Sequence, residues 1–351
     1  MDGILSGKRV VVTGGTGSLG SVLVRRLLRG ELGRPSAVVV FSRDEAKQHA
    51  MRVAYQALTA ATDEIIFEDW HRVLRFQIGD VGDEASVRSA LQGADVVFNA
   101  AAMKQVPTCE YFPYQAVRTN ILGAEHIIRV IRQHRLPVET VIAISTDKAC
   151  KPVNVMGMTK ALQERIFIQA NLDCEQTRFV GARYGNVLAS RGSVIPLFQE
   201  QIARGGPVTL TTPNMTRFLM NIDQAVDTIF AALREALPGE IYIPRVPSAR
   251  MVDVAQVMVG DRQIPVTYTG IRPGEKVHEI LVSDEEATRT VARGPYYAIG
   301  PMLPELHDMH PKEPPALSCE FSSGDNLLNV DGVRRLLEDN QLLRPIEMSA
   351  A

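Results

Sequence analysis

An acidic and a basic residue stand together directly after an apolar stretch of strand length. Thr146, Asp147 and Lys148 follow the run ETVIAIS, residues 139–145. Open α/β sheets bind their ligands at the carboxyl edge of the strands. A carboxylate and an amine placed at such an edge can take part in general acid–base catalysis. The alternative is that Asp147 and Lys148 form a solvated pair that caps the next helix.

A glycine-rich turn near the N-terminus predicts a dinucleotide site. It lies in the stretch KRVVVTGGTGSLGSVLVRRLLRG, which reads as a short strand, a turn and a helix. Glycines at such a turn let backbone N–H groups and the helix N-terminus approach a pyrophosphate. A purely structural turn is the alternative. The predicted cofactor contacts in this turn are Gly14, Thr16, Gly17, Ser18, Leu19 and Gly20.

The end of the second predicted strand bears on the choice of cofactor. NAD-specific proteins tend to place an acidic residue there, whereas this chain has Ser42 and Arg43. A hydroxyl and a guanidinium suit a 2′-phosphate, so NADP is favoured and NAD stays possible; Arg43 could also be a solvated surface charge. Asp80 could bind the adenine amino group or cap a helix starting at Asp83. Further cofactor candidates at later strand ends are Val81, Ala100, Ala101 and Tyr184.

The overall composition favours a small-molecule partner. The 351 residues are 45% hydrophobic and 22% charged with a net charge of −2, so no long-range attraction to nucleic acid or anionic lipid is expected. Four cysteines, at 109, 150, 174 and 319, form no CxxC pair and no metal-binding spacing, which indicates reduced thiols and no metal site. No run reaches the ~20 apolar residues that cross a bilayer. We therefore expect a cytoplasmic protein.

Apolar runs alternate with helical stretches through the first half of the chain. This alternation predicts an α/β fold of Rossmann type, with a parallel sheet wound on both sides. The predicted strands include SAVVVFS, VLRFQIGD and ADVVFNAAA. We assign residues 1–185 to the NADP-binding domain, with a later strand near 240–244 rejoining it. Residues 186–300 form a smaller interleaved substrate-binding region, and residues 301–351 a C-terminal extension that is extended over 302–325 and ends in a helix.

Six segments together resemble the extended short-chain dehydrogenases that act as UDP-N-acetylglucosamine 4,6-dehydratases. The likeness covers about residues 7–290. That wider family usually has a tyrosine four residues before the lysine, but here Met156 stands four residues before Lys160. The C5-inverting capsule and O-antigen dehydratases also carry Met-Gly at this place, so the missing tyrosine is interpreted as a subfamily trait. The segments are TGGTGSLG, NAAAMKQVPTCEYFPYQAVRTN, STDKACKPVNVMGMTK, ARYGNVLASRGSVIPLF, TRFLM and RPGEKVHE.

The resemblance implies roles for the residues around Asp147. A 4,6-dehydratase oxidises C4 of the hexose, eliminates water across C5 and C6, and returns the hydride to C6. By resemblance Lys148 is the C5 base, Asp147 the acid for the departing hydroxide, and Lys160 the ligand of the nicotinamide ribose, with Thr146 beside them. We expect burial beside Lys160 and the nicotinamide to lower the pKa of Lys148. Asp147, Lys148 or a water on Lys160 could deprotonate the C4 hydroxyl.

The same resemblance implies a pocket for UDP-N-acetylglucosamine or a related UDP-hexose. Arginines suit it because a guanidinium can bind two phosphate oxygens at once. Lys104 could instead be a surface lysine, and RPGEK an exposed turn. The family also implies a homo-oligomer, a dimer or a hexamer. The predicted substrate-binding residues are Lys104, Asn186, Arg217, Arg272 and Glu275.

Three functions compete at this stage. The first is the dehydratase, whose product would be a UDP-2-acetamido-2,6-dideoxy-hex-4-ulose, with C5 inverted to the L-arabino form or retained. A UDP-hexose 4-epimerase normally needs the tyrosine and has no use for an adjacent Asp and Lys. A non-catalytic NADP-binding scaffold requires none of Asp147, Lys148 and Lys160. The residues therefore favour the dehydratase.

Overall fold

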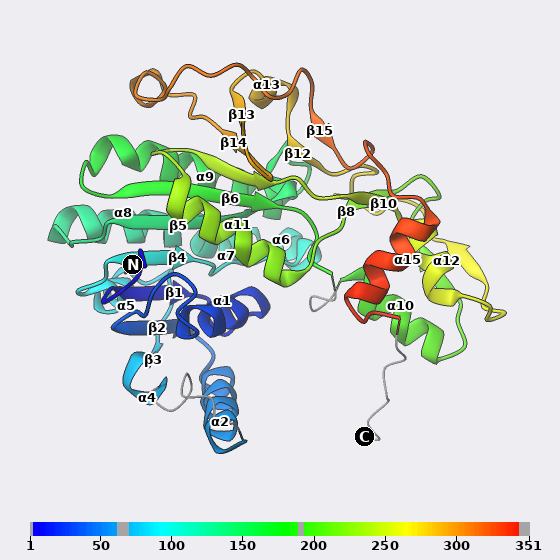
Figure 1. Ribbon diagram of the computed structural model, residues 1–351, viewed down its shortest axis with the longest axis horizontal. Helices are drawn as coiled ribbons and strands as arrows, with labels where there is room; N and C mark the ends of the chain where they lie inside the picture. Colours follow the sequence, from blue (N-terminus) through cyan, green and yellow to red (C-terminus); the bar gives the residue numbers. More distant parts are fainter. Residues whose placement is uncertain (1–2, 62–69, 189–192, 344–351) are drawn as a thin grey trace.

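The computed structural model describes residues 3–61, 70–188 and 193–343 (Figure 1). A nine-stranded sheet runs through these residues in the order β13-β14-β9-β6-β5-β4-β1-β2-β3. Its strands are β1 Arg9–Thr13, β2 Ala37–Ser42, β3 Leu74–Ile78, β4 Val96–Asn99, β5 Thr140–Thr146, β6 Arg178–Tyr184, β9 Ile241–Pro244, β13 Thr290–Arg293 and β14 Tyr296–Ile299.

Most of this sheet is parallel. Every pairing from β3 across to β9 is parallel, and only β14 and β13 run antiparallel. The order β3-β2-β1-β4-β5-β6 is that of the Rossmann fold, which confirms the predicted fold class. The carboxyl ends of these strands therefore meet at one edge, where the glycine turn and Asp147 both lie.

Helices cover both faces of the sheet because its central strands are apolar on both sides. In β1, Val10 and Val12 pack into one core cluster, whereas Val11 packs into another on the opposite face. In Figure 1, α1 and α11 lie in front of the sheet. The first face is covered by α1 Ser18–Leu28, α11 Ile222–Glu235, α2 Glu45–Ala61 and α4 Trp70–Val73, and the second by α5 Glu84–Leu91, α8 Gly123–His134 and α9 Val155–Asp173.

The helical stretch over residues 116–134 is not one regular helix. It comprises the end of α7 (Pro113–Ala116), the π-helical turn η1 (Val117–Leu122) and α8, and α6 (Val106–Tyr111) precedes it. The wide turn accommodates Asn120, which is fully buried. π-turns inside helices often occur at functional sites, and Asn120 holds a loop of the pocket described below.

A second group of elements has its own apolar core. Ile195, Phe198, Met258, Val333 and Leu337 belong to this core, and α10, α12 and α15 lie together to the right of the sheet in Figure 1. The final helix of the C-terminal extension thus packs on the central part of the chain. The elements are α10 Val194–Ala203, β7 Val208–Leu210, β8 Thr216–Phe218, β10 Ser248–Arg250, α12 Met251–Val259, β11 Val266–Tyr268 and α15 Val330–Asp339.

Two parts of the C-terminal half differ from the sequence prediction. Residues 290–299, predicted to belong to the substrate-binding region, form β13 and β14 and extend the sheet beside β9. The stretch 302–325 is not wholly extended, because the short helix α14 (Pro304–His307) lies within it. The same stretch contains the strand β15 (Phe321–Ser322). β15 pairs with β12 (Ile280–Val282), which precedes α13 (Asp284–Ala287). No helix in the described part of the chain is long and apolar enough to cross a lipid bilayer.

Candidate active site

A pocket of about 870 Å³ opens at the carboxyl edge of the sheet and extends toward the second group of elements. It brings together the side chains that the sequence predicted, except Asp147, which lies behind its wall. Those that line it are Gly14, Thr16, Gly17, Ser18, Leu19, Gly20, Ser42, Arg43, Asp80, Val81, Ala100, Ala101, Lys104, Thr146, Lys148, Lys160, Tyr184, Asn186, Arg217, Arg272 and Glu275.

The glycine turn is shaped to receive a phosphate group. Gly14 has a φ of +65°, and a Cβ there would lie 2.8 Å from the backbone of Ala100. Helix α1 begins at Ser18, and its N-cap, Gly17, supplies no side chain to its first N–H groups. Because these N–H groups face the pocket without a side-chain partner, the turn fits the pyrophosphate of a dinucleotide.

The end of β2 is fixed by a residue that the sequence prediction missed. The buried Gln48 amide donates to the Ser42 carbonyl at 3.1 Å, to its hydroxyl at 3.0 Å and to the Gln77 carbonyl at 2.9 Å. Arg43 is 61% exposed and lies 3.4 Å from an Asp80 carboxylate oxygen. Lys47, also missed, lines the same part of the pocket. Lys47 pairs with Asp44 at 2.7 Å, so each of the two cations near Ser42 has a carboxylate partner.

Asp80 does not cap the following helix, so that alternative is wrong. Its Oδ1 accepts from the Gly82 N–H at 2.9 Å, within the turn. Helix α5 starts at Glu84, and its cap is Asp83, which accepts from the Ser86 N–H at 2.9 Å. The other oxygen of Asp80, Oδ2, accepts a hydrogen bond from Arg43 at 3.4 Å, and both residues line the pocket.

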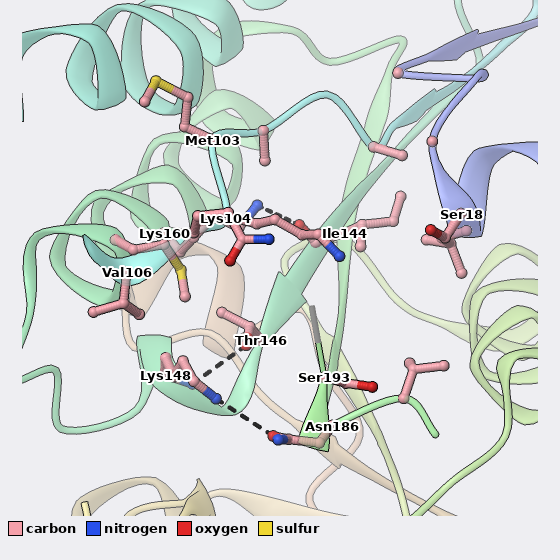
Figure 2. Close-up of a pocket in the computed structure, with 18 of the residues that line it drawn as sticks. Ser18, Met103, Lys104, Val106, Ile144, Thr146, Lys148, Lys160, Asn186 and Ser193 are labelled. Carbon is pink, nitrogen blue, oxygen red and sulfur yellow. Dashed lines mark hydrogen bonds between the residues drawn. The ribbon is translucent and has the colours of Figure 1, made fainter. Parts of the chain in front are cut away.

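Asp147 and Lys148 form an ion pair between a buried carboxylate and a partly buried amine. Asp147 is fully buried, and its Oδ1 lies 3.0 Å from Lys148 Nζ and accepts from the Thr146 hydroxyl at 2.9 Å. Lys148 Nζ also approaches Asn186 Oδ1 at 3.4 Å (Figure 2). The alternative of a solvated capping pair is therefore wrong, since the short helix η2 (Asp147–Ala149) is capped by the Thr146 side chain.

A second carboxylate, Glu279, contacts the same amine. Its Oε1 lies 3.2 Å from Lys148 Nζ and 3.9 Å from Arg217 Nε, and its side chain is almost fully buried. The sequence prediction missed Glu279, although it is the last residue of the quoted segment RPGEKVHE. Arg217 also donates to the carbonyls of Thr216 and Val277 at 2.7 and 3.1 Å, which turns its guanidinium toward this cluster.

The pKa of Lys148 is shifted in the direction opposite to the one predicted from the sequence. Burial lowers the pKa of Lys148, but Asp147 and Glu279 outweigh burial and raise it above its ordinary value. The expectation failed because two carboxylates, not Lys160, are the amine's neighbours. Burial raises the pKa of Asp147 and Glu279 raises it further, whereas Lys148 and Thr146 only partly oppose this. In the cluster, Asp147 is therefore the carboxyl group that holds a proton more readily.

Of Lys148 and Lys160, it is Lys160 whose pKa is lowered. Burial lowers its pKa from 10.5 to about 8, and its amine donates to the Ile144 carbonyl and to Gln163 Oε1. Met156, one helical turn earlier, is buried in an apolar cluster with Cys109 and Ala116. The neighbouring Gly157 allows α9 to approach η2, because a Cβ there would lie 2.2 Å from the Lys148 carbonyl oxygen.

The remaining predicted substrate residues lie on two loops at the mouth of the pocket. Lys104 is exposed there, in a loop that the buried Asn120 amide holds through the Met103 N–H at 2.9 Å and carbonyl at 3.1 Å. Arg272 and Glu275 close a turn by a backbone hydrogen bond of 3.1 Å, so the RPGEK segment is a turn that also lines the pocket. Among the described residues, no group of three or more His, Cys, Asp or Glu could hold a metal ion.

Comparison with known proteins gives the family. A sequence profile described as polysaccharide biosynthesis protein matches residues 10–301. The chain belongs to this family. A UDP-glucose 4-epimerase of Rickettsia bellii is 40% identical to this polysaccharide biosynthesis protein over 297 residues, 83% of this chain and 82% of the relative. An uncharacterised membrane protein of Methanocaldococcus jannaschii is 43% identical over 290 residues, 80% of this chain and 81% of that one.

A solved structure matches the polysaccharide biosynthesis protein over nearly its whole length. The X-ray structure of Pen from Bacillus thuringiensis has 31% sequence identity and a TM-score of 0.85, and the match covers 97% of this chain and 99% of the other. The family profile ends at residue 301, before β15 and α15. The structural match therefore extends into the C-terminal extension, about which the resemblance in sequence said little.

Proposed function

We propose that this polysaccharide biosynthesis protein is an NADP-dependent UDP-N-acetylglucosamine 4,6-dehydratase that inverts C5. The observation that carries the proposal is the ion pair of Asp147 and Lys148, in which a carboxyl group that binds its proton readily adjoins an amine at the pocket. An elimination needs an acid for the leaving hydroxide and a base for the carbon proton. The pair supplies both from adjacent residues.

The pair can prime itself without a proton from solvent. Lys148 Nζ donates to Asp147 Oδ1 at 3.0 Å, so one proton transfer along this hydrogen bond gives a neutral amine and a carboxylic acid together. The raised pKa of Asp147 lowers the cost of this transfer, because burial disfavours its ionised form, whereas the raised pKa of Lys148 opposes it. The transfer also removes two opposite charges from a buried site.

The primed pair then carries out the elimination. When bound, the nicotinamide would accept a hydride from C4 and return it to C6. The proton of the C4 hydroxyl passes to a water in the pocket beside Lys160. Lys148 takes the C5 proton, and the C5–H electron pair forms the C5–C6 double bond as the C6–O bond breaks. The Asp147 carboxyl lies behind the pocket wall, so it gives its proton to the Thr146 hydroxyl, which lines the pocket and contacts Asp147 Oδ1 at 2.9 Å. The Thr146 hydroxyl in turn gives its own proton to the departing hydroxide, which leaves as water. The pair thus returns to its ionised form. As the hydride bonds to C6, the electron pair of the C5–C6 double bond shifts to C5. A water on the opposite face of C5 then supplies the proton that completes the inversion, and this proton balances the one lost from the C4 hydroxyl.

Basic residues at each end of the pocket support the choice of ligands. Ser42, Arg43 and Lys47 at the β2 end can bind a 2′-phosphate, which favours NADP over NAD. Arg217 and Arg272, from β8 and from the RPGEK turn, can neutralise the diphosphate of a UDP-sugar. The name of the Rickettsia bellii relative also supports a UDP-hexose as the class of substrate.

Incubation with UDP-N-acetylglucosamine followed by mass spectrometry tests the proposal. The expected product has lost one water, with no net absorbance change at about 340 nm because the hydride returns to the product. Build-up of reduced cofactor in proportion to product would identify an ordinary dehydrogenase instead. No change in the sugar would favour the non-catalytic scaffold.

A UDP-hexose 4-epimerase is the second candidate, and the name of the Rickettsia bellii relative favours it. Its product would be an isomer of the same mass as the substrate. Met156 argues against it, because the side chain four residues before Lys160 is a thioether buried among apolar groups and cannot exchange a proton. UDP-glucose should be assayed beside UDP-N-acetylglucosamine to separate the two candidates.

A further inference from the structure

Glu279 lies in the acid–base cluster, and only one of its two carboxylate oxygens contacts a partner there. Its side chain is about 3% exposed, and Oε1 contacts Lys148 Nζ at 3.2 Å. Within the described residues, Glu279 Oε2 and Asp147 Oδ2 are both buried without a hydrogen-bond partner. A buried carboxylate oxygen without a partner is costly for stability. Such oxygens beside a pocket point to a role in the chemistry of the site.

The C-terminal extension fixes the position of Glu279. The Glu279 N–H donates to Ser323 Oγ at 2.9 Å, and the Ser323 N–H donates to the Glu279 carbonyl at 2.8 Å. Ser323 is fully buried, and its hydroxyl lies 2.7 Å from that of Thr216 on β8. The backbone of Glu279 is thus held from two sides, so its carboxylate is directed at Lys148 by the fold.

We propose that Glu279 is a positioning residue of the acid–base centre, which holds the Lys148 amine at the pocket and stabilises the positive charge that the amine gains from the C5 proton. The inference rests on the proposed dehydratase function. In the primed state Lys148 is neutral and Asp147 is protonated, so Asp147 attracts the ammonium that develops on Lys148 only as it gives up its own proton. Glu279 is then the carboxylate in contact with Lys148, and its charge favours the transition state over the primed ground state.

The charged groups around the cluster are consistent with an ionised Glu279. Burial raises the pKa of Glu279, but Lys148, Arg217 and Lys276 outweigh burial and bring the pKa below its ordinary value. Arg217 approaches from β8 and Lys276 from the turn before β12, while Asp147 faces Lys148 from the end of β5. Glu279 and Asp147 thus have opposite proton preferences, which suits a fixed countercharge beside an exchanging acid.

The test compares Glu279→Gln and Glu279→Asp with the wild-type protein over a range of pH. Glu279→Gln should lower kcat about 10²-fold with little change in KM. It should also move the ascending limb of the kcat profile about 1–3 pH units toward acid. Glu279 raises the pKa of both Asp147 and Lys148, so without it the pair loses its second proton at a lower pH. Glu279→Asp, which keeps the charge, should restore part of both. Glu285→Gln removes an equal charge from an exposed position on α13 and should change neither.

Two results would overturn the inference. One is a Glu279→Gln variant in which kcat and the ascending limb of the kcat profile against pH are both the same as in the wild-type protein. The other is a fall in kcat with the limb unmoved, which would mean a purely structural role.

A thermal-melting comparison separates this inference from the proposed function. Lys148→Met leaves the buried Glu279 without its nearest cation and with only Arg217, at 3.9 Å, as an ion-pair partner. Adding Glu279→Gln should therefore raise the melting temperature above that of Lys148→Met alone. A double variant that melts no higher would show that the two side chains are not coupled, whatever the activity. Conversely, a wild-type protein that removes no water from UDP-N-acetylglucosamine would contradict the proposed function. The melting comparison would still show whether Glu279 and Lys148 interact.

Discussion

Replacement of Arg183 by methionine should strongly destabilise the fold, because this arginine joins three elements around the site. Its side chain is 1% exposed on β6, and all of its hydrogen bonds are made to buried groups. It binds Glu164 of α9 at 2.7 and 3.0 Å, Glu286 of α13 at 2.8 Å through two nitrogens, and the Leu281 carbonyl at 2.8 Å. Arg183→Met would leave two buried carboxylates without their cation.

The pKa shift of Glu286 gives the size of the loss in stability expected for Arg183→Met. Burial raises the pKa of Glu286, but Arg183 outweighs burial and lowers it from 4.5 to about 2. Each pKa unit corresponds to about 1.4 kcal/mol, so the shift represents about 3 kcal/mol of the free energy of unfolding. Loss of one partner from a buried ion pair typically costs ~3–5 kcal/mol. We expect Arg183→Met to lose an amount in this range at pH 7.

The sign of the pH dependence follows from the direction of the shift. A carboxylate with a lowered pKa in the folded state contributes stability that is fully present above its unfolded value of 4.5. That stability is lost as the pH falls toward 2. The difference in unfolding free energy between wild type and Arg183→Met should therefore be largest near neutral pH and shrink as the pH falls through 4.5.

Urea unfolding at pH 7 and at acid pH measures this difference. Arg132→Met is the control, because Arg132 pairs with Asp173 at 2.9 Å on the surface, where an ion pair is worth about 0–1 kcal/mol. Adding Glu286→Gln to Arg183→Met should recover part of the loss. If Arg183→Met proved as stable as Arg132→Met, the cluster would contribute little and this reasoning would be wrong.

Four further outcomes are expected. Asp147→Asn and Lys148→Met should each reduce the rate of water loss from UDP-N-acetylglucosamine about 10²–10⁴-fold by mass spectrometry, whereas Met156→Ala should be much milder. Gly157→Ala should cost about 1–3 kcal/mol in urea unfolding, because its Cβ meets the Lys148 carbonyl, while Met158→Ala on the exposed side of α9 should cost little. Arg43→Ala should weaken NADP binding about tenfold or more by calorimetry and leave NAD nearly unaffected; equal losses would refute a 2′-phosphate contact. Proton NMR of product formed in D₂O should show the L-arabino form with deuterium at C5, and a D-xylo product would mean retention.

The sequence could predict those features that are set by short segments. The glycine turn, Ser42 with Arg43, and Thr146 to Lys148 each follow a strand within a few residues, and parallel strands bring their carboxyl ends to one edge. The fold class and the composition of that edge were therefore accessible. The cap of α5 was not, because Asp80 and Asp83 are both suitable residue types and only the hydrogen bond to Ser86 distinguishes them.

Contacts between distant segments could not be predicted. Glu279 is far from Lys148 in sequence, and its position depends on Ser323 in an extension that carried no motif. The direction of the Lys148 pKa depends on that contact, which is why burial alone suggested the wrong sign. In the same way, Gln48 reads as an ordinary helix residue until the structure shows its amide bridging the ends of β2 and β3.

The absence of the tyrosine is consistent with the way the two lysines are divided. Lys160 has the depressed pKa that general-base chemistry would require, yet its amine is occupied by the Ile144 carbonyl and Gln163, and the side chain one turn away is Met156 in an apolar cluster. Lys148 has a raised pKa, but the neighbouring Asp147 carboxylate can accept its proton. The second carboxylate, Glu279, can stabilise the ammonium that forms when Lys148 later takes a proton from the substrate. In an elimination, proton exchange within such a cluster matters more than the resting pKa of one amine. The proposed proton transfers of the elimination at the end of β5 therefore need no tyrosine on α9.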